Sequence, residues 1–354
     1  MLDLLVIGAG ISGLRTADLA VAAGLDTLVV EARDRVGGRL HSLPVDQGTI
    51  DLGATWFWAG ERHVEQLIHE LDIPVHAQHL AGDAVYHDPQ QTRRLDGNPI
   101  DVPSGRFTAG AQDLAQRLAD RLPPSTIRLG EAATAVHRTD DHLAVQTAEA
   151  EHAAHHVVLA LPPALAAHAI EFTPPLPEPL GSLARSTPVW MGAIVKVVAV
   201  YPNAFWRDAG LAGAAMSHVG PMREIHDMSG PAGTPAALFG FVPLMEADQP
   251  APTPEDVVDQ LIQLFGPDAA NPSALHLTDW RSEAHTAPPG AELLRAYQTY
   301  GHPLWAEPAM DGRLHWSSTE TAPVNPGHID GALASAARVA ATVIADRSPQ
   351  RSQP

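Results

Sequence analysis

The chain contains no cysteine, and Lys196 is its only lysine, whereas arginine occurs 21 times. Without cysteine there is no disulfide, no thiolate metal site and no cysteine nucleophile. This composition is typical of a reducing compartment. Because arginine supplies the ordinary surface charge, a lysine within the apolar run 190–200 suggests a task for which a guanidinium is unsuited. The alternative is a side chain whose ammonium reaches the surface.

Long apolar segments and basic clusters are also absent. No apolar run approaches the roughly 18 residues of a membrane-spanning helix, and the start of the chain lacks the basic residues of a signal peptide. A net charge of −19 argues against nucleic acid, whose phosphates need clustered lysine and arginine. We therefore expect a cytoplasmic protein with no membrane or nucleic-acid partner. The acidic balance favours solubility or attraction of a cationic small molecule, and no spacing of histidines and acids predicts a metal site.

The length of 354 residues exceeds that of a single core, so two domains are expected. The chain begins with a strand, a helix and a strand, at Leu4–Ile7, Ile11–Ala23 and Asp26–Glu31, which form a βαβ unit of an α/β fold. The proline-rich stretch Phe172–Pro188 reads as a crossover. Further helices are predicted at Glu61–Leu71, Gln112–Leu122, Val257–Phe265 and Ala332–Ala345, and further strands at Ile127–Leu129, Ala133–Arg138, Leu143–Gln146, His156–Leu161, 193–200, 212–217, 223–228, 236–242 and Leu275–Trp280.

A glycine-rich turn connects the first strand to the first helix and reads Gly8-Ala9-Gly10-Ile11-Ser12-Gly13. In this pattern the first glycine permits the turn, the second lets the backbone approach a pyrophosphate, and the third lets helix and strand pack closely. Free N–H groups at the helix N-terminus would bind the phosphates. Glu31, at the end of the second strand, is placed to accept hydrogen bonds from ribose hydroxyls. These features predict a dinucleotide site, and the alternative is a glycine turn of an unrelated α/β protein.

A second glycine pair, Gly37-Gly38, is followed by Arg39 and separates FAD from NAD. It would bring another backbone segment to the same pyrophosphate, together with a guanidinium that can bind phosphate through two parallel hydrogen bonds. An NAD site has no evident need for this second clamp. Ala32 and Arg33 lie between Glu31 and the glycine pair, and the alternative for Arg33 is a solvated surface charge.

Two further segments suit a flat ring and a polar chain. Gly53, Ala54 and Thr55 are small enough for a ring to approach closely, and Trp56 begins an aromatic run that could equally belong to the core. In the segment 312–332, a strand, Glu320, a glycine-rich turn and a helix N-terminus would form a second anion site. An ordinary connection between a strand and a helix is the alternative there.

Taken in order, these segments resemble the flavin-containing amine oxidases, the family that includes monoamine and polyamine oxidases. The resemblance covers residues 3–345 and rests on the glycine turn and on segments 37–39, 52–56, 157–163, 191–196 and 319–321. It implies a two-domain, Rossmann-like FAD-binding fold of the glutathione-reductase type with a smaller, mixed-sheet substrate domain. We assign residues 1–75, 105–182 and 283–346 to the FAD-binding domain, 76–104 and 183–282 to the substrate-binding domain, and 347–354 to a tail.

The same resemblance implies roles for particular residues around a non-covalently bound FAD. Glu31 and Arg33 would lie at the adenosine ribose and Arg39 at the pyrophosphate, with the backbone of Ala133 at the adenine. Glu320 would meet the ribityl and phosphate region, and the N–H of Ile329 the pyrimidine carbonyl. Lys196 would hold a water at the flavin N5, with Trp280 against the ring. His328 would replace one of two aromatic rings that face each other across the substrate, and its alternatives are a base or a structural histidine.

The sequence also departs from the family. A long, mostly helical insertion that relatives carry before the segment 110–114 is missing, so we expect a wider or less covered active site. The segment that usually supplies the second aromatic ring, Ala284–Gly290, contains none, so the aromatic cage is expected to be absent. Trp58 stands where some polyamine oxidases carry an acid that binds a distal ammonium, and Glu61 is the nearby substitute.

The function predicted from the resemblance is an FAD-dependent amine oxidase, with an amine and oxygen as its partners. Hydride transfer to the flavin would yield an imine that water hydrolyses to an aldehyde, while oxygen is reduced to hydrogen peroxide. A polyamine is favoured because the acidic balance and a less covered site suit a long cation. The alternatives are a primary monoamine oxidase, an FAD-dependent desaturase or dehydrogenase, and a non-catalytic flavoprotein. An amino-acid oxidase would need an arginine near the flavin, and we could place none. The oligomeric state is unknown.

Overall fold

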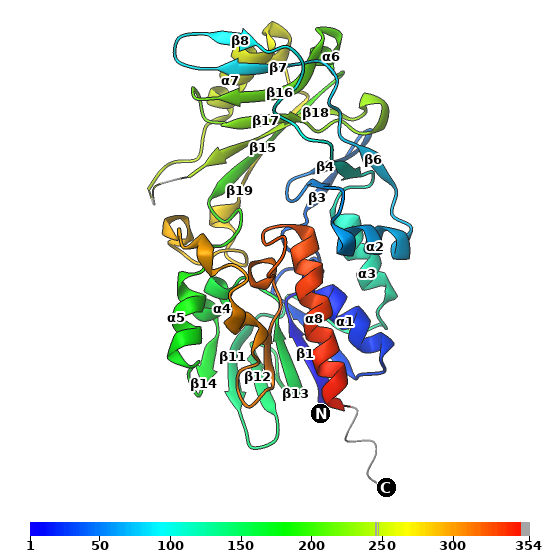
Figure 1. Ribbon diagram of the computed structural model, residues 1–354, viewed down its shortest axis with the longest axis vertical. Helices are drawn as coiled ribbons and strands as arrows, with labels where there is room; N and C mark the ends of the chain where they lie inside the picture. Colours follow the sequence, from blue (N-terminus) through cyan, green and yellow to red (C-terminus); the bar gives the residue numbers. More distant parts are fainter. Residues whose placement is uncertain (245, 247, 348–354) are drawn as a thin grey trace.

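The computed structural model describes residues 1–244, 246 and 248–347, which include two large sheets (Figure 1). The predicted tail lies outside the described residues, apart from position 347 at the end of the last helix. The larger sheet contains β1 (Leu2–Ile7), β2 (Thr27–Glu31), β10 (Ile127–Leu129), β11 (Ala133–Arg138), β12 (Leu143–Thr147), β13 (Glu151–Leu159), β14 (Glu171–Thr173) and β20 (Leu314–Trp316). Its order is β10-β2-β1-β13-β12-β11-β14, with β20 also paired to β13.

The smaller sheet has the order β19-β15-β18-β17-β16-β7-β8. Its strands are β7 (Asp83–His87), β8 (Thr92–Arg94), β15 (Ile194–Tyr201), β16 (Leu211–Ser217), β17 (Glu224–Asp227), β18 (Ala236–Pro243) and β19 (Ala274–Asp279). A hairpin of β3 (Ser42–Val45) and β4 (Gly48–Asp51) and a sheet of β5 (Trp56–Phe57), β9 (Gly105–Phe107) and β6 (Val75–Ala77) lie at the side of the molecule between the two large sheets (Figure 1).

The central strands of the larger sheet are buried on both faces. In β1, Leu4 and Val6 pack into one core and Leu5 and Ile7 into another. The first core is covered by helices α1 (Ile11–Ala22), α2 (Arg62–Leu71), α3 (Gln112–Arg121) and α8 (Ile329–Arg347), and the second includes residues of α4 (Pro163–Ala169) and α5 (Glu178–Ser186). Parallel strands covered on both faces need apolar side chains on both. The nearly continuous apolar run of β1 follows from this requirement.

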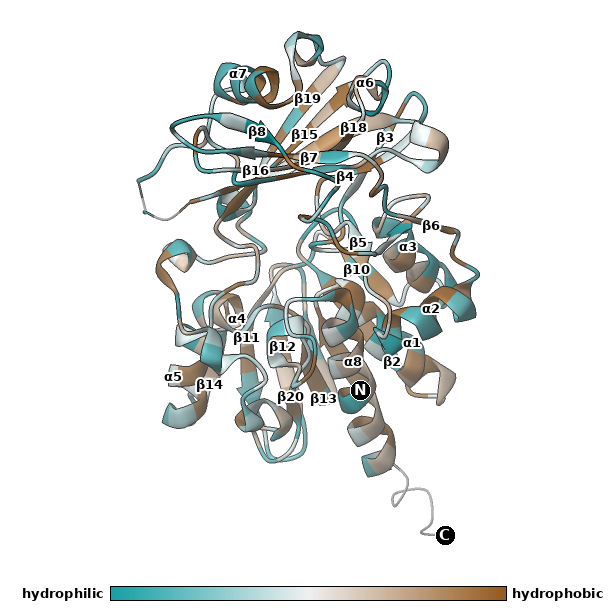
Figure 2. Cartoon of the chain, turned by 45° about the horizontal axis from the view of Figure 1, so that its top comes forward, coloured by the Kyte–Doolittle hydropathy of each residue, from teal (hydrophilic) through white to brown (hydrophobic). Residues whose placement is uncertain are grey.

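Alternation along β15 gives the smaller sheet two different faces. Val195 and Val197 pack with α7 (Pro254–Phe265), whereas Val198 and Val200 pack with Ile50 of the β3–β4 hairpin. Figure 2 shows α7 over this sheet with both hydrophobic and hydrophilic residues, as an amphipathic helix requires. Because side chains alternate along a strand, Lys196 lies on the face that is turned toward the hairpin and the larger sheet.

Most predicted elements occur within a few residues of the predicted ends, and the exceptions have physical causes. Strand β13 begins at Glu151 rather than His156, because its polar first half is held by antiparallel pairing with β12. The predicted crossover Phe172–Pro188 includes the end of strand β14 and the whole of helix α5, which buries Leu180 and Ala184. The terminal helix begins at Ile329 rather than Ala332. Among the described residues, none of the helices combines the length and the hydropathy needed to cross a bilayer.

Candidate active site

A cavity of about 800 Å³ is lined by residues at the carboxyl ends of the parallel strands and by residues of the smaller sheet. Three residues to which the sequence gave a role in the site, Gly13, Glu61 and Glu320, do not line it. The structure brings together all the others, which are Gly8, Gly10, Ile11, Ser12, Glu31, Ala32, Arg33, Gly38, Arg39, Gly53, Ala54, Thr55, Trp56, Ala133, Lys196, Trp280, His328 and Ile329.

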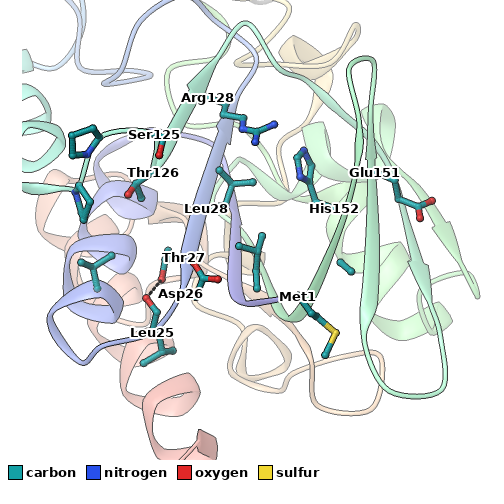
Figure 3. A pocket seen from close by; sticks show the side chains of 15 residues that line it. Met1, Leu25, Asp26, Thr27, Leu28, Ser125, Thr126, Arg128, Glu151 and His152 are labelled. Atoms are coloured by element: carbon teal, nitrogen blue, oxygen red, sulfur yellow. Dashed lines mark hydrogen bonds between the residues drawn. The ribbon is translucent and has the colours of Figure 1, made fainter.

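A second cavity of about 580 Å³ lies near the opposite ends of the same strands (Figure 3). Its lining includes Met1 before β1, Leu28 in β2 and His152 in β13, and none of the predicted site residues. In open α/β sheets, ligands bind outside the carboxyl ends of the strands. The first cavity is therefore the candidate active site.

The three glycines of the first turn have different surroundings. Gly8 adopts a φ of +106° that favours glycine, and a Cβ on Gly13 would lie 2.0 Å from the carbonyl oxygen of Gly8. Gly13 thus provides close packing between helix and turn, which explains why it does not line the cavity. A Cβ on Gly10 would meet nothing within 4 Å. An isolated bridge between Gly10 and Gly37 brings the second glycine pair alongside.

The start of helix α1 offers free donors to this cavity. The first helical hydrogen bond runs from the N–H of Leu14 to the carbonyl of Gly10, and no side chain caps the helix. The N–H groups of the three residues before Leu14 therefore have no partner within the helix. Nearby, Ser318 also lines the cavity, and its buried hydroxyl has no hydrogen-bond partner in the part of the chain that the structure describes. These donors and the open side of Gly10 fit the pyrophosphate of FAD.

Glu31 is held in place by the backbone of the two segments beside it. Its Oε2 accepts from the N–H of Ala9 at 2.7 Å and its Oε1 from the N–H of Arg33 at 2.9 Å. Each carboxylate oxygen can accept more than one hydrogen bond, so Glu31 keeps capacity for ribose hydroxyls. The guanidinium of Arg33 binds Glu283 at 3.1 Å and Thr286 at 2.7 Å, so it is partnered within the protein and is not a free surface charge.

Arg39 and Glu320 form an ion pair with each other, which the sequence did not predict. Nη1 and Nη2 of Arg39 donate to the two carboxylate oxygens of Glu320 at 2.7 and 3.1 Å. Burial raises the pKa of Glu320, but Arg39 outweighs this effect and the pKa lies below its ordinary value. The bidentate fork that we expected on the pyrophosphate is thus occupied by a carboxylate. Glu320 lies behind Arg39 instead of facing the cavity.

Lys196 is 1% exposed and binds the turn that follows β4. Its Nζ donates to the carbonyl oxygen of Gly53 at 2.6 Å and to the hydroxyl of Thr55, and lies 4.6 Å from the ring centroid of Phe239. An ammonium has three donors, so one N–H remains for the cavity. Burial lowers the pKa of Lys196 to about 7, with Asp51 opposing this effect and Arg106 adding to it.

Trp280 is fixed nearby by a hydrogen bond of 3.1 Å from its Nε1 to the carbonyl oxygen of Leu52.

His328 forms one wall of the cavity together with Trp58. The two ring centroids are 4.9 Å apart, at an interplanar angle of 41°. The Nδ1 of His328 lies 2.5 Å from Oε1 of Glu61, whose Oε2 accepts from the N–H of Trp58 at 3.1 Å. Glu61 does not line the cavity. It is therefore the partner of His328, and the expectation that it replaces the missing acid is corrected.

A row of side chains on the smaller sheet was missed by sequence analysis. Lys196 is in register with Phe241 on β18, and Phe241 is in register with Glu224 on β17. Residues directly opposite each other share one face of a sheet, and all three line the cavity. Arg223, which the sequence did not single out, also lines the cavity. The row depends on the register of β18 with both β17 and β15, for which the sequence carries no local signal.

Among the residues that the structure describes, no three histidine, aspartate or glutamate side chains converge to hold a metal ion. The polar groups of the cavity instead suit a nucleotide at one end and a small polar molecule at the other.

Comparison with known proteins identifies the class of this site. The family model described as "Flavin containing amine oxidoreductase" matches residues 11–109 and 102–344. The chain belongs to this family. It is an FAD-dependent amine oxidase and not a non-catalytic flavoprotein, and the residues of the cavity fit that cofactor.

Three similar proteins illustrate the range of the family. AofH of Mycobacterium tuberculosis, named as a flavin-containing monoamine oxidase, is 29% identical over 447 residues, covering 97% of this chain and 96% of the relative. An L-amino acid dehydrogenase of Synechocystis is 30% identical over 251 residues, covering 66% of this chain and 50% of the relative. A solved putrescine oxidase with bound putrescine shares the fold, with a TM-score of 0.85, 22% identity and coverage of 97% and 99%.

These comparisons bear on the missing insertion. The alignment with AofH runs over 447 residues, although this chain has 354, so the relative carries many residues without a counterpart here. The two matches to the family model meet at residues 102–109. This break falls just before the segment 110–114, where we expected the insertion to be missing.

Proposed function

We propose that this amine oxidase acts on a diamine or a polyamine, with one amine oxidised beside Lys196 and a second ammonium bound by Glu224. The observation that carries the proposal is the row of Lys196, Phe241 and Glu224 along one wall of the cavity. Neighbouring strands lie about 5 Å apart, so the first and last residues of the row are separated by about 10 Å. In this arrangement the Glu224 carboxylate would bind the second ammonium, and the Phe241 ring would contact the methylene chain. The reacting amine would lie at the end of the cavity with Lys196 and Trp280.

The charges of the row agree with this assignment. His226 holds the pKa of Glu224 below its ordinary value, so Glu224 is ionised at neutral pH. The net charge of −19 adds a long-range attraction for a polycation. The solved neighbour with putrescine, a diamine, shows that this fold accommodates such a substrate.

Five residues of the cavity have parts in the proposed reaction. FAD, when bound, supplies the hydride acceptor, and oxygen regenerates it with release of hydrogen peroxide. Gly53, Ala54 and Ile329 would hold the flavin ring, and Trp280 would limit access of water to it. Lys196 would use its remaining N–H to hold a water and would provide positive charge where oxygen gains electrons. Hydrolysis of the imine product then gives an aldehyde.

The test compares 1,4-diaminobutane with butylamine, which lacks the second cation. Glu224→Gln should raise the KM for the diamine at least about tenfold, since hydrogen bonds to charged groups contribute about 1.5–3 kcal/mol. The KM for butylamine should change less than about twofold, because Glu224 has no partner in that substrate. Peroxide release measures both. Equal changes for the two amines, or no preference of the wild type for the diamine, would overturn the proposal in favour of a monoamine oxidase.

A second candidate is an oxidase of amino acids, favoured by Arg223. Its exposed side chain lines the cavity, and a guanidinium is suited to a substrate carboxylate. The similarity to an L-amino acid dehydrogenase points the same way. Glu224 next to it would repel that carboxylate, which is why we place diamines first. Peroxide release from amino acids that is abolished by Arg223→Met, with diamines inactive, would establish this alternative.

A further inference from the structure

His226 on β17 is a buried histidine that lies between two carboxylates. Its Nδ1 lies 2.5 Å from Oδ1 of Asp101, and its Nε2 lies 3.7 Å from Oε2 of Glu224. The side chains of His226 and Asp101 are 7% and 5% exposed, whereas that of Glu224 is 52% exposed. Nε2 has no hydrogen-bond partner among the described residues. A buried polar atom without a partner is rare and calls for an explanation.

The imidazole ring is held firmly by its surroundings. His226 is in register with Phe239, and their ring centroids are 5.2 Å apart. Trp56 packs its ring against the imidazole at 5.0 Å and 86°. Asp101 is itself fixed, because Nδ2 of Asn98 donates to its Oδ2 at 2.9 Å. The direction in which Nε2 points is therefore set by packing on several sides.

That direction is toward the carboxylate which lines the cavity. Glu224 and His226 are two residues apart on one strand, so both lie on the face that carries Lys196. Burial lowers the pKa of His226, but its contacts with Asp101 and Glu224 outweigh this effect and leave the pKa above its ordinary value. An imidazolium has a donor on each nitrogen. One N–H serves Asp101, and the other faces Glu224.

We propose that Asp101 and His226 are positioning residues that act through Glu224, holding its carboxylate where it binds the second cation of the substrate. The proposal rests on the diamine function proposed above. A carboxylate held in place before binding loses less conformational freedom when the cation arrives. Positioning of Glu224 should therefore lower the KM for a diamine but not that for a monoamine. The rate at which the reacting amine is oxidised should not change.

The decisive experiment compares two substitutions of His226 with the same two substrates. In His226→Asn the amide lies near the former Nδ1, where it can serve Asp101 but cannot reach Glu224. In His226→Gln an amide N–H can lie near the former Nε2, toward Glu224. We expect the Asn variant to raise the KM for 1,4-diaminobutane about tenfold, which is 1.4 kcal/mol. The Gln variant should stay within about threefold of the wild type, and kcat and all butylamine values should remain within about twofold.

His76 provides a matched control. It is another histidine whose buried Nε2 has no hydrogen-bond partner within residues 1–244, 246 and 248–347, but it lies on β6 and does not line the cavity. His76→Asn should lower the melting temperature by an amount similar to that for His226→Asn, without changing the ratio of the KM values for the two amines. This control separates a general cost of changing a buried histidine from an effect transmitted through Glu224.

The outcomes distinguish this proposal from the function on which it rests. If the wild type prefers the diamine but the Asn and Gln variants behave alike, or change both amines equally, His226 is a structural residue and the inference fails alone. If the wild type shows no preference for the diamine, the diamine function fails and the inference fails with it. A diamine-specific loss in the Asn variant and its recovery in the Gln variant support both.

Discussion

The two ends of the cavity are built in different ways. At the nucleotide end, the proposed binding groups are the backbone of two glycine segments and the first turn of α1, and Glu31 is held by the N–H groups of Ala9 and Arg33. At the substrate end, the proposed binding groups are single side chains from separate strands, namely Lys196, Phe241 and Glu224.

This difference has a consequence for how changes act. A backbone cradle depends on the absence of side chains, so additions at glycine should disturb the nucleotide end most. A site made from side chains depends on their charges and on their neighbours, so truncations should disturb the substrate end most. Substitutions at the two ends of the cavity test this contrast.

The largest effect is expected at the substrate end from Lys196→Met. Removing the positive charge from a dry site should slow reoxidation of the reduced flavin by about 10²–10³, the range for loss of a preorganised electrostatic contact. Stopped-flow mixing of the reduced protein with oxygen measures this rate. Flavin content should change little, because Lys196 hydrogen-bonds Gly53 and Thr55 and neither of the two glycine segments at the start of α1. An unchanged rate would remove Lys196 from the reaction.

The next effect separates two glycines of the same turn. Gly10→Ala adds a methyl group that meets no protein atom within 4 Å, so the apoprotein should keep its melting temperature while FAD binding weakens about tenfold or more, which is at least 1.4 kcal/mol. Gly13→Ala places a Cβ 2.0 Å from the carbonyl of Gly8 and should also destabilise the fold by about 1–3 kcal/mol. Flavin fluorescence titration and thermal unfolding of the apoprotein measure the two effects. Normal FAD affinity in Gly10→Ala would contradict the proposed cradle.

A smaller effect concerns the charge of Lys196, whose pKa is lowered to about 7. Below that pH the side chain is an ammonium and above it a neutral amine, so the reoxidation rate should fall as the pH rises through about 7. Thr55→Val removes an acceptor that favours the charged form, and should lower this pKa by about one unit. Thr55→Ser should preserve it.

The composition of the chain makes this measurement direct. Because Lys196 is the only lysine, selective isotope labelling of lysine side chains gives a single resonance whose pH titration reports its pKa. A pKa near 10 in the wild type, or equal values in the Val and Ser variants, would refute the role assigned to burial and to Thr55.

The smallest effect is expected from Arg33→Met. Its partner Glu283 is 42% exposed, and ion pairs with an exposed partner contribute about 0–1 kcal/mol. The melting temperature should therefore fall only slightly, and FAD affinity should decrease less than in Gly10→Ala. A complete loss of flavin in Arg33→Met would show that side chains matter at the nucleotide end as much as the backbone does.

The sequence predicted the site best where residues close together in the chain form one local structure. The turn from Gly8 to Gly13 and the acid at Glu31 could be interpreted because a strand, a tight turn and a helix specify one local geometry. Lys196 was recognised because it is the only lysine of the chain and lies in an apolar run. The partnership of Arg39 with Glu320 was missed, because 281 positions separate the two residues and each also fitted a contact with the cofactor.

Glu61 shows the opposite error. Its place near Trp58 favoured a role in binding an ammonium, but the structure pairs it with His328. Because Glu61 is close to Trp58 in the sequence, it was correctly expected near this wall of the cavity. Its contact with His328 follows only from the tertiary packing, which brings the start of α8 beside it. Glu224 and Arg223 carried no comparable signal, since Glu224 begins a short, ordinary strand and Arg223 directly precedes it.

The order of residues along the chain determined the cofactor class, because the nucleotide cradle consists of contiguous segments whose backbone geometry follows from glycine and from the helix that comes next. The tertiary structure decided the substrate end, where the register of β15, β18 and β17 places Lys196, Phe241 and Glu224 in one row. Register is set by the burial of whole sheet faces, and a shift by one residue would turn each of these side chains to the other face.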